Sequence, residues 1–392
     1  MIHVDTESFF VIVLAAALAA VTVVAVPGRF VAPVVVVEIA LGILIGPQVL
    51  DIARADHFID FFATLGLGML FFFAGYEIDF GKIRGRPLRL GGAGWVLSIL
   101  LAFVIGAALE VAGVIDSFLY VGAAMATTAM GTLIPILHDQ GETHTRFSAF
   151  LLAAGCAGAF GPIVLVTLFL STDHPLHEAL ILVAFVVMAV AVALASTGMA
   201  LRHWAALERT IEASSQLTVR VTIVLVFGLV LLADQIGLDV LLGGFVAGLI
   251  TRAALEGREI RVFESKLAAV GFGFFVPFFF VTSGIGFDLD ALGSAGALAK
   301  LALFFGLFLL VRGAPAILLY RGVLDLRDRS ALAFYSATEL PLVVAITTIA
   351  VDAGHMRTST AAGLVGAGML STLVFPLLAA SLRGDRLRAA GA

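Results

Sequence analysis

The stretch from Ala126 to Pro135, ATTAMGTLIP, interrupts a long apolar run with hydroxyl groups, a glycine and a proline. A second stretch, from Ser336 to Pro341, reads SATELP and interrupts a later apolar run in the same way. Broken helices free backbone carbonyls, which together with threonine hydroxyls can replace water around a cation. Each stretch alone also fits an ordinary kink whose hydroxyls bond to the preceding turn. Two breaks at corresponding places favour a pair of discontinuous helices that cross.

The composition of the chain indicates whether water or lipid surrounds it. Of 392 residues, 61% are hydrophobic and 13% are charged, whereas soluble domains carry about 25% charged residues. This deficit of charge excludes a soluble enzyme, a nucleic-acid-binding protein and a disordered chain. The composition instead predicts an all-α polytopic membrane protein whose partner is the lipid bilayer.

A helix that spans a membrane needs about 20 mostly apolar residues. The hydropathy pattern predicts about thirteen transmembrane helices, over residues 8–26, 31–47, 58–77, 88–109, 117–137, 147–171, 177–200, 217–233, 238–252, 263–284, 296–320, 329–351 and 357–382. The second and the ninth of these helices are short and rich in glycine, and we expect both to pack tightly against their neighbours.

The distribution of basic residues predicts the orientation. The chain has 23 Lys and Arg residues; with the N-terminus outside, nineteen fall in inward segments and three in outward ones. The remaining one is Arg312, inside the eleventh helix. Cytoplasmic loops carry the excess of basic residues. We therefore expect an N-terminus outside and a C-terminus in the cytoplasm, in the inner (plasma) membrane of a bacterium.

Two segments of the chain resemble each other. Residues 70–80 read LFFFAGYEIDF, and residues 277–288 read PFFFVTSGIGFD. They end helices that are seven helices apart, an odd number, so the two copies run in opposite directions. Inverted repeats are typical of secondary transporters. We therefore expect one transporter unit over 1–392, with helices 1–6 and 8–13 as the repeats and the helix at 177–200 as their linker; chance similarity of phenylalanine-rich helices is the alternative.

Few residues within the spans can carry chemistry. Glu339 and Arg312 lie at mid-membrane, where an ionisable side chain is expensive and is a functional candidate by default; a structural ion pair is the competing interpretation. We expect Thr127, Thr128 and Glu339 to line a monovalent cation site, with Thr338 beside them. No nucleophile, base or metal cluster converges in the sequence, so we expect neither enzymatic activity nor a cofactor.

Three further motifs link the chain to a known family. Residues 38–47 read EIALGILIGP, residues 65–79 follow as the third helix, and residues 237–248 read GLDVLLGGFVAG. In this order they resemble the monovalent cation:proton antiporter-2 family, the Kef-type and Nap-type sodium or potassium/proton antiporters, over essentially the whole chain. The resemblance implies a homodimer, with a dimerisation domain beside a core domain in which the fifth and twelfth helices unwind and cross. It also implies elevator-like transport and a contact of Arg312 with an essential acid.

That acid is missing from this chain. The family carries an aspartate or glutamate on the sixth helix, whereas residues 154–163 read AGCAGAFGPI. We align the missing carboxylate with Ala159. Three explanations remain open: a deliberate replacement that traps one state, transfer of the proton-accepting role to Glu339, or loss of coupled transport. Without its partner, Arg312 is expected to contact Glu339, a carbonyl group or water.

The leading hypothesis is a secondary transporter that exchanges Na⁺ or K⁺ for protons by elevator-type alternating access; whether Ala159 disables or uncouples it stays open. A non-transporting membrane sensor or channel-like module is one alternative. A sodium-coupled organic-anion symporter is another, although it would need a larger polar cavity. Many Kef-type proteins continue into a nucleotide-binding regulatory domain, and we expect none here, since no glycine-rich fingerprint appears outside the spans.

Overall fold

The computed structural model describes residues 5–25, 33–77, 85–130, 133, 137, 142, 145–169, 187, 191, 216–235, 240–255, 261–290, 293 and 295–390. All the regular elements within these ranges are helices. In the described part of the chain, eight helical segments are long and apolar enough to cross a membrane, and three shorter apolar helices accompany them. The prediction of an all-α polytopic membrane protein is confirmed. The predicted helix at 177–200 lies almost wholly outside the described residues, so the total of thirteen stays a prediction.

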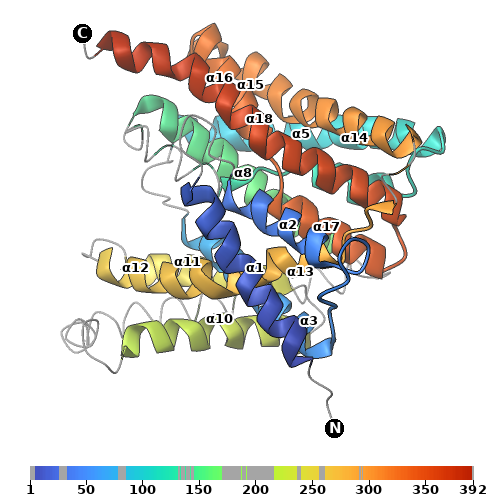
Figure 1. Ribbon diagram of the computed structural model, residues 1–392. Helices are drawn as coiled ribbons and strands as arrows, with labels where there is room; N and C mark the ends of the chain where they lie inside the picture. The colour runs from blue at the N-terminus through green and yellow to red at the C-terminus, as the bar shows by residue number, and fades with distance from the viewer. Residues whose placement is uncertain are drawn as a thin grey trace. The chain divides into compact units, whose positions relative to one another are not determined.

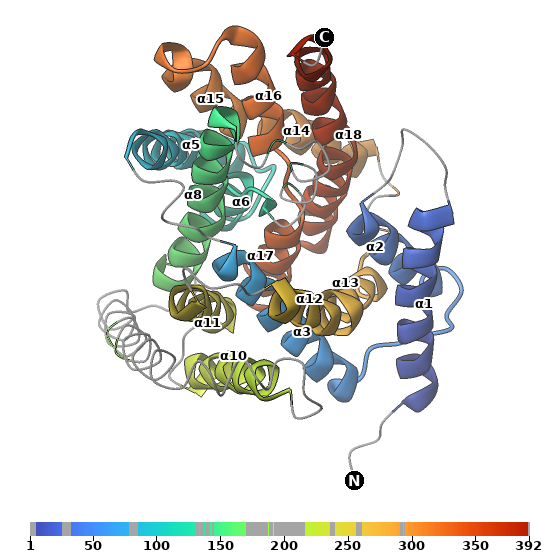
Figure 2. The same ribbon diagram turned by 90° about the vertical axis from the view of Figure 1, so that its left-hand side faces the viewer.

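The chain divides into two compact units, each made of two separate parts of the sequence. The first unit comprises Met1–Asp79 and Thr167–Gly286. Its helices are α1 (Thr6–Ala25), α2 (Val34–Ile45), α3 (His57–Tyr76), α10 (Leu217–Gln235), α11 (Val240–Leu255), α12 (Arg261–Val270), the π-helical turn η1 (Gly271–Phe275) and α13 (Val276–Ile285). Within this unit α10 and α11 run side by side (Figure 2).

Close packing in the first unit depends on glycine. A Cβ atom added to Gly42 of α2 would collide with the carbonyl oxygen of Val281 in α13, and one added to Gly284 would collide with that of Ile39. Small residues let membrane helices approach until their backbones touch. The tight packing predicted for the short second helix is therefore confirmed.

The second unit comprises Phe80–Val166 and Phe287–Ala392. Its helices are α5 (Arg86–Val111), α6 (Phe118–Met125), α8 (Arg146–Phe169), α14 (Ala295–Phe308), the π-helical turn η3 (Leu309–Gly313), α15 (Ala314–Leu319), the 3₁₀ turn η4 (Tyr320–Gly322), α16 (Leu326–Ser336), α17 (Pro341–Asp352) and α18 (Thr358–Ala390). The long helix α18 packs along α14, as Figure 1 shows.

Both predicted breaks are present in the second unit. Helix α6 ends at Met125, and the backbone of residues 126–129 is not helical. Helix α16 ends at Ser336, and α17 begins only at Pro341. Proline suits the first position of a helix because its missing N–H has no partner there in any case. The prediction that the fifth and the twelfth apolar runs are discontinuous is confirmed.

Two π-helical turns occur at the same distance before a proline. The turn η1 ends two residues before Pro277, and η3 ends two residues before Pro315. A proline inside a helix removes one N–H and its ring displaces the carbonyl four residues earlier. The helix can absorb this displacement by widening, which is a π-bulge, and such bulges are frequent at functional sites. Arg312 lies in one of them.

Candidate functional site

The two unwound segments of the second unit meet through their backbones. The N–H of Ala129 donates a hydrogen bond of 2.8 Å to the carbonyl of Thr338. The N–H of Thr128 donates to the carbonyl of Gly158 in α8, at 3.2 Å. The indole N–H of Trp95, in α5, donates to the carbonyl of Ala126 at 3.2 Å. Neighbouring helices thus replace the hydrogen bonds that the breaks removed, as a low-dielectric environment requires.

The hydroxyl of Thr128 is the centre of a second set of contacts. It donates a hydrogen bond of 2.7 Å to the carbonyl of Ser336, at the end of α16. It accepts hydrogen bonds from Nε and Nη2 of Arg312, at 3.1 and 2.8 Å. One hydroxyl therefore joins the first unwound segment, the end of α16 and the eleventh apolar run.

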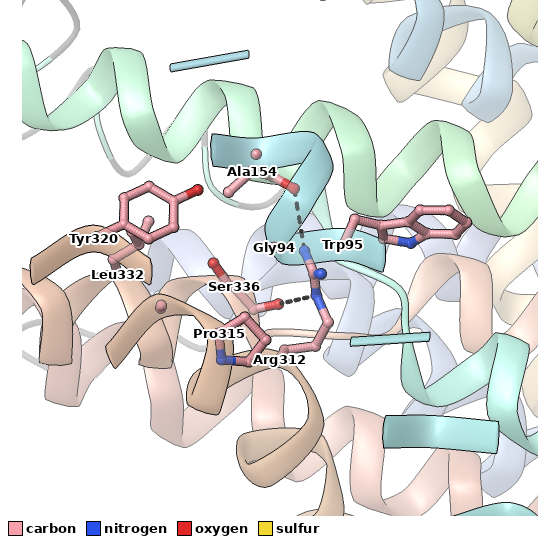
Figure 3. Close-up of a pocket in the computed structure, with 10 residues that line it drawn as sticks. Gly94, Trp95, Ala154, Arg312, Pro315, Tyr320, Leu332 and Ser336 are labelled. Carbon is pink, nitrogen blue, oxygen red and sulfur yellow. Dashed lines mark hydrogen bonds between the residues drawn. The ribbon is translucent and has the colours of Figure 1, made fainter. Parts of the chain in front are cut away.

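The guanidinium of Arg312 is surrounded by neutral oxygen atoms. Besides Thr128, it donates to the hydroxyl of Ser98 at 3.1 Å and to the carbonyl of Ala154 at 3.1 Å. Figure 3 shows the guanidinium between the carbonyls of Ala154 and Ser336. In the part of the chain that the structure describes, no carboxylate lies within the 4.0 Å of an ion pair. The sequence predicted Glu339, a carbonyl group or water as the partner of Arg312, and the structure shows carbonyl groups.

Glu339 lies in the second unwound segment and is fully buried. Among the described residues, neither of its carboxylate oxygens has a hydrogen-bond partner. The charge of Arg312 acts on this carboxylate, although the two side chains form no direct ion pair. A buried polar group without a partner is uncommon in folded proteins and calls for a functional explanation.

The backbone of Glu339 is held more tightly than its side chain. Its N–H donates a hydrogen bond of 3.0 Å to Oγ of Ser371 in α18, and its carbonyl accepts one of 2.9 Å from the same hydroxyl. The hydroxyls of the two remaining threonines bond to carbonyls of the helices that precede them. The hydroxyl of Thr127 donates to the carbonyl of Ala124, and that of Thr338 donates to the carbonyl of Phe334.

The segment of α8 around Ala159 packs against the pair formed by Thr128 and Arg312. A Cβ atom added to Gly158 would lie 2.5 Å from Nη2 of Arg312 and 2.6 Å from the hydroxyl of Thr128. Ala159, the next residue, is buried. The position aligned with the missing acid is therefore one residue from the contact with Arg312.

A small pocket opens beside Arg312 (Figure 3). It is lined by Gly91, Gly94, Trp95, Ala154, Arg312, Pro315, Ala316, Tyr320, Leu332 and Ser336. Its free volume of about 10 Å³ is close to the space that one water molecule needs. The hydroxyl of Tyr320 is buried and has no hydrogen-bond partner among the described residues.

Several residues of the site were not predicted from the sequence, namely Trp95, Ser98, Tyr320 and Ser371. Each is a single polar side chain in an apolar run. Such residues are common in membrane helices, so their presence alone does not mark a functional site. They could have been assigned to this site only if the neighbouring helices had been known.

A family model described as "Sodium/hydrogen exchanger, transmembrane" matches residues 13–381. The chain belongs to the sodium/hydrogen exchanger family. The resemblance to monovalent cation:proton antiporters is thereby confirmed, and the chain is a multi-pass membrane protein of that family.

Relatives of this chain carry antiporter names. It is 22% identical over 360 residues to a putative Na⁺/H⁺ antiporter of Bacillus subtilis, YjbQ; the match covers 88% of this chain and 58% of the relative. It is 25% identical over 272 residues to the Na⁺/H⁺-K⁺ antiporter GerN of Bacillus cereus, with 67% of each chain covered. The chain thus spans little more than half the length of YjbQ.

A solved structure has the same fold. The sodium proton antiporter MjNhaP1 of Methanocaldococcus jannaschii superposes with a TM-score of 0.61 and covers 97% of both chains, at 16% sequence identity. The prediction of a sodium/proton-antiporter-like fold is confirmed by this likeness.

Proposed function

We propose that this chain exchanges Na⁺ or K⁺ for protons, with the ion site at the two unwound segments of the second unit. The observation that carries the proposal is Glu339, a fully buried carboxylate without a hydrogen-bond partner among the described residues. The names of the relatives support the same class of transport. A bound cation or a bound proton would each satisfy this carboxylate.

Competition for Glu339 would couple the two fluxes. A nearby cation favours the ionised carboxylate, whereas burial favours the protonated one, so one group cannot favourably hold both ligands. Because the hydroxyls of Thr127 and Thr338 use their hydrogens on helix carbonyls, their oxygen lone pairs are the part left to offer a cation. We assign these two threonines as accessory ligands.

Thr128 and Arg312 have a different role in this proposal. The hydroxyl of Thr128 already accepts two hydrogen bonds from Arg312 and donates one, which leaves it little capacity for a cation. We therefore assign Thr128 to hold Arg312 in place. Arg312 would then balance Glu339 when the carboxylate loses its proton and no cation has arrived.

In the family's pattern an acid at Ala159 would compete for the same ligands. Its absence from this chain leads us to propose that Glu339 has taken over as the proton-accepting group. Elevator-type movement, a homodimer and an N-terminus outside the cell are parts of the proposal that rest on the family resemblance and on the distribution of basic residues. The aligned position also suits a disabled antiporter, so the test must separate these two cases.

The test is exchange in proteoliposomes, followed with an internal pH dye after addition of Na⁺ or K⁺. We expect exchange by the unsubstituted chain and its loss in Glu339→Gln. Glu38→Gln is the matched control, because Glu38 is a buried carboxylate in α2 of the first unit. Activity in Ala159→Asp alone would identify a disabled antiporter. Silence of both the unsubstituted chain and Ala159→Asp would overturn the proposal and favour the sensor hypothesis.

A further inference from the structure

The contact between Ser371 and Glu339 has an unusual form. A serine hydroxyl in a helix ordinarily bonds to a carbonyl three or four residues earlier in the same helix. Ser371 makes that bond, to the carbonyl of Gly368 at 2.8 Å. The same oxygen also accepts a hydrogen bond of 3.0 Å from the N–H of Glu339, and its single hydrogen is shared between the carbonyl of Gly368 and the carbonyl of Glu339, which lies at 2.9 Å. A single buried hydroxyl thus holds both sides of one residue of the unwound segment.

The helix that carries Ser371 is close enough to this segment to exclude a side chain. A Cβ atom added to Gly368, one turn before Ser371, would lie 2.8 Å from the carbonyl oxygen of Glu339. Gly368 and Ser371 therefore bring the backbone of α18 against residue 339 at two points of one helical face. The unwound backbone has no helical hydrogen bonds at Glu339 to fix its direction.

The direction of the Glu339 side chain follows from this backbone contact. Among the described residues its carboxylate has no hydrogen-bond partner, although the charge of Arg312 and the hydroxyl of Thr127 act on it. The orientation of the Cα–Cβ bond is set by the two adjoining peptide groups, and both of these are bonded to Ser371. Rotation of either peptide would turn the carboxylate away from its present place.

We propose that Ser371 is a positioning residue, which aims the carboxylate of Glu339 at the site where the cation and the proton compete. The inference rests on the proposed function, since it assigns a role to the support of the ion-binding acid. Ser371 itself does not touch the cation. Its loss should weaken cation binding and move the pH dependence of exchange, because a displaced carboxylate meets a different environment.

The experiment compares Ser371→Ala with two reference variants in proteoliposomes. Ser371→Thr keeps the hydroxyl. Thr347→Val is the matched control, because Thr347 is a buried hydroxyl of α17 that bonds only to the carbonyls of Val343 and Val344 in its own helix. The apparent KM for Na⁺ and for K⁺, the maximal rate and the pH midpoint of exchange are measured for each. The stabilisation of the purified protein by each cation, measured as a thermal shift, reports binding without transport.

We expect Ser371→Ala to raise the apparent KM by about tenfold, the effect of losing one to two net hydrogen bonds, to move the pH midpoint and to reduce the cation-induced thermal shift. Ser371→Thr should recover the unsubstituted values, and Thr347→Val should stay within about twofold of them. A lower maximal rate with unchanged KM and pH midpoint would mean a merely structural role and would overturn the inference while the proposed function stood. Absence of exchange and of any cation-induced shift in the unsubstituted chain would overturn both.

Discussion

Among the described residues of the second unit two arginines are buried, and their surroundings differ in kind. Arg383, near the end of α18, donates three hydrogen bonds to the carboxylate of Glu142, at 2.8 to 3.0 Å, and one of 2.6 Å to Asp328. Its guanidinium also lies 4.0 Å from the centre of the Phe147 ring. Arg312 is buried as deeply, yet its partners are hydroxyls and carbonyls.

The difference separates a structural charge from a responsive one. Bringing a charge out of water costs several kcal/mol, and a partner ion with good geometry offsets most of this cost. Arg383 has two such partners, so its charge is compensated within its own cluster. Arg312 has only dipoles for direct partners, so its energy changes when Glu339 gains or loses a proton or a cation. A site that couples two ions requires a charge of this second kind.

The largest effect should come from breaking the cluster of Arg383, Glu142 and Asp328. In Arg383→Ala the buried carboxylates of Glu142 and Asp328 lose their partner, and the protein should lose about 3–5 kcal/mol of stability. Thermal unfolding of the purified protein measures this loss. Restoring neutrality with Arg383→Met, Glu142→Gln and Asp328→Asn together should recover a large part of it. A loss below about 1 kcal/mol in Arg383→Ala would contradict the assignment of a structural ion cluster.

Arg312→Met should have a smaller effect on stability and a larger one on transport. It leaves neutral oxygens behind, so the expected loss of stability is about 1.5–3 kcal/mol, the range for hydrogen bonds to a charged group. Exchange should fall by about tenfold or more, since the charge that balances Glu339 is gone. Arg312→Lys keeps the charge but loses the planar set of N–H donors, so its exchange rate should lie between those of the unsubstituted chain and Arg312→Met. Unchanged exchange in Arg312→Met would contradict the claim that Arg312, unlike Arg383, takes part in transport.

An exposed ion pair is expected to contribute the least to stability of the charged groups compared. Asp116 and Arg357 lie outside the membrane-spanning segments and form an ion pair of 2.8 Å with both side chains partly exposed. Such pairs contribute about 0.2–1 kcal/mol. The hydrogen bond from the Arg357 guanidinium holds the pKa of Asp116 below its usual value, so this contribution is present above the unfolded pKa and is lost as the pH falls through the folded one.

Asp116→Asn should therefore lower the unfolding temperature slightly at neutral pH. The difference from the unsubstituted chain should vanish in acid, where the protonated carboxyl of Asp116 is as neutral as an asparagine amide. It should also shrink in 1 M salt because charges are screened. A destabilisation as large as that of Arg383→Ala would show that burial does not govern the strength of these ion pairs.

The sequence was sufficient to predict the helices and breaks that depend only on the residues within the segment itself. A bilayer requires long apolar runs, so hydropathy placed α3 and α5 within a few residues of their observed ends. The breaks at residues 126–129 and 337–340 followed from threonine and proline in apolar surroundings, since these residues disrupt or cap helices wherever they occur.

Contacts between distant helices could not be predicted in this way. Ser98 reaches Arg312 across 214 positions of sequence, and Ser371 reaches Glu339 across 32. Each contact depends on the relative rotation of two helices, which small residues such as Gly158 and Gly368 set by allowing close approach. The sequence around a single threonine, serine or arginine does not identify the residue that it contacts in the folded protein.

The π-helical turn that carries Arg312 has a consequence for the evolution of this helix. A π turn holds one residue more than the α-helical geometry around it, so it amounts to an insertion that the helix has absorbed without a loop. Deleting one residue between Leu309 and Gly313 would restore regular α-helical winding and leave the helical turns on both sides facing as they do now. Arg312 and Pro315 are therefore expected to be inherited together, and a relative that lacks the proline should align here with a gap of one residue.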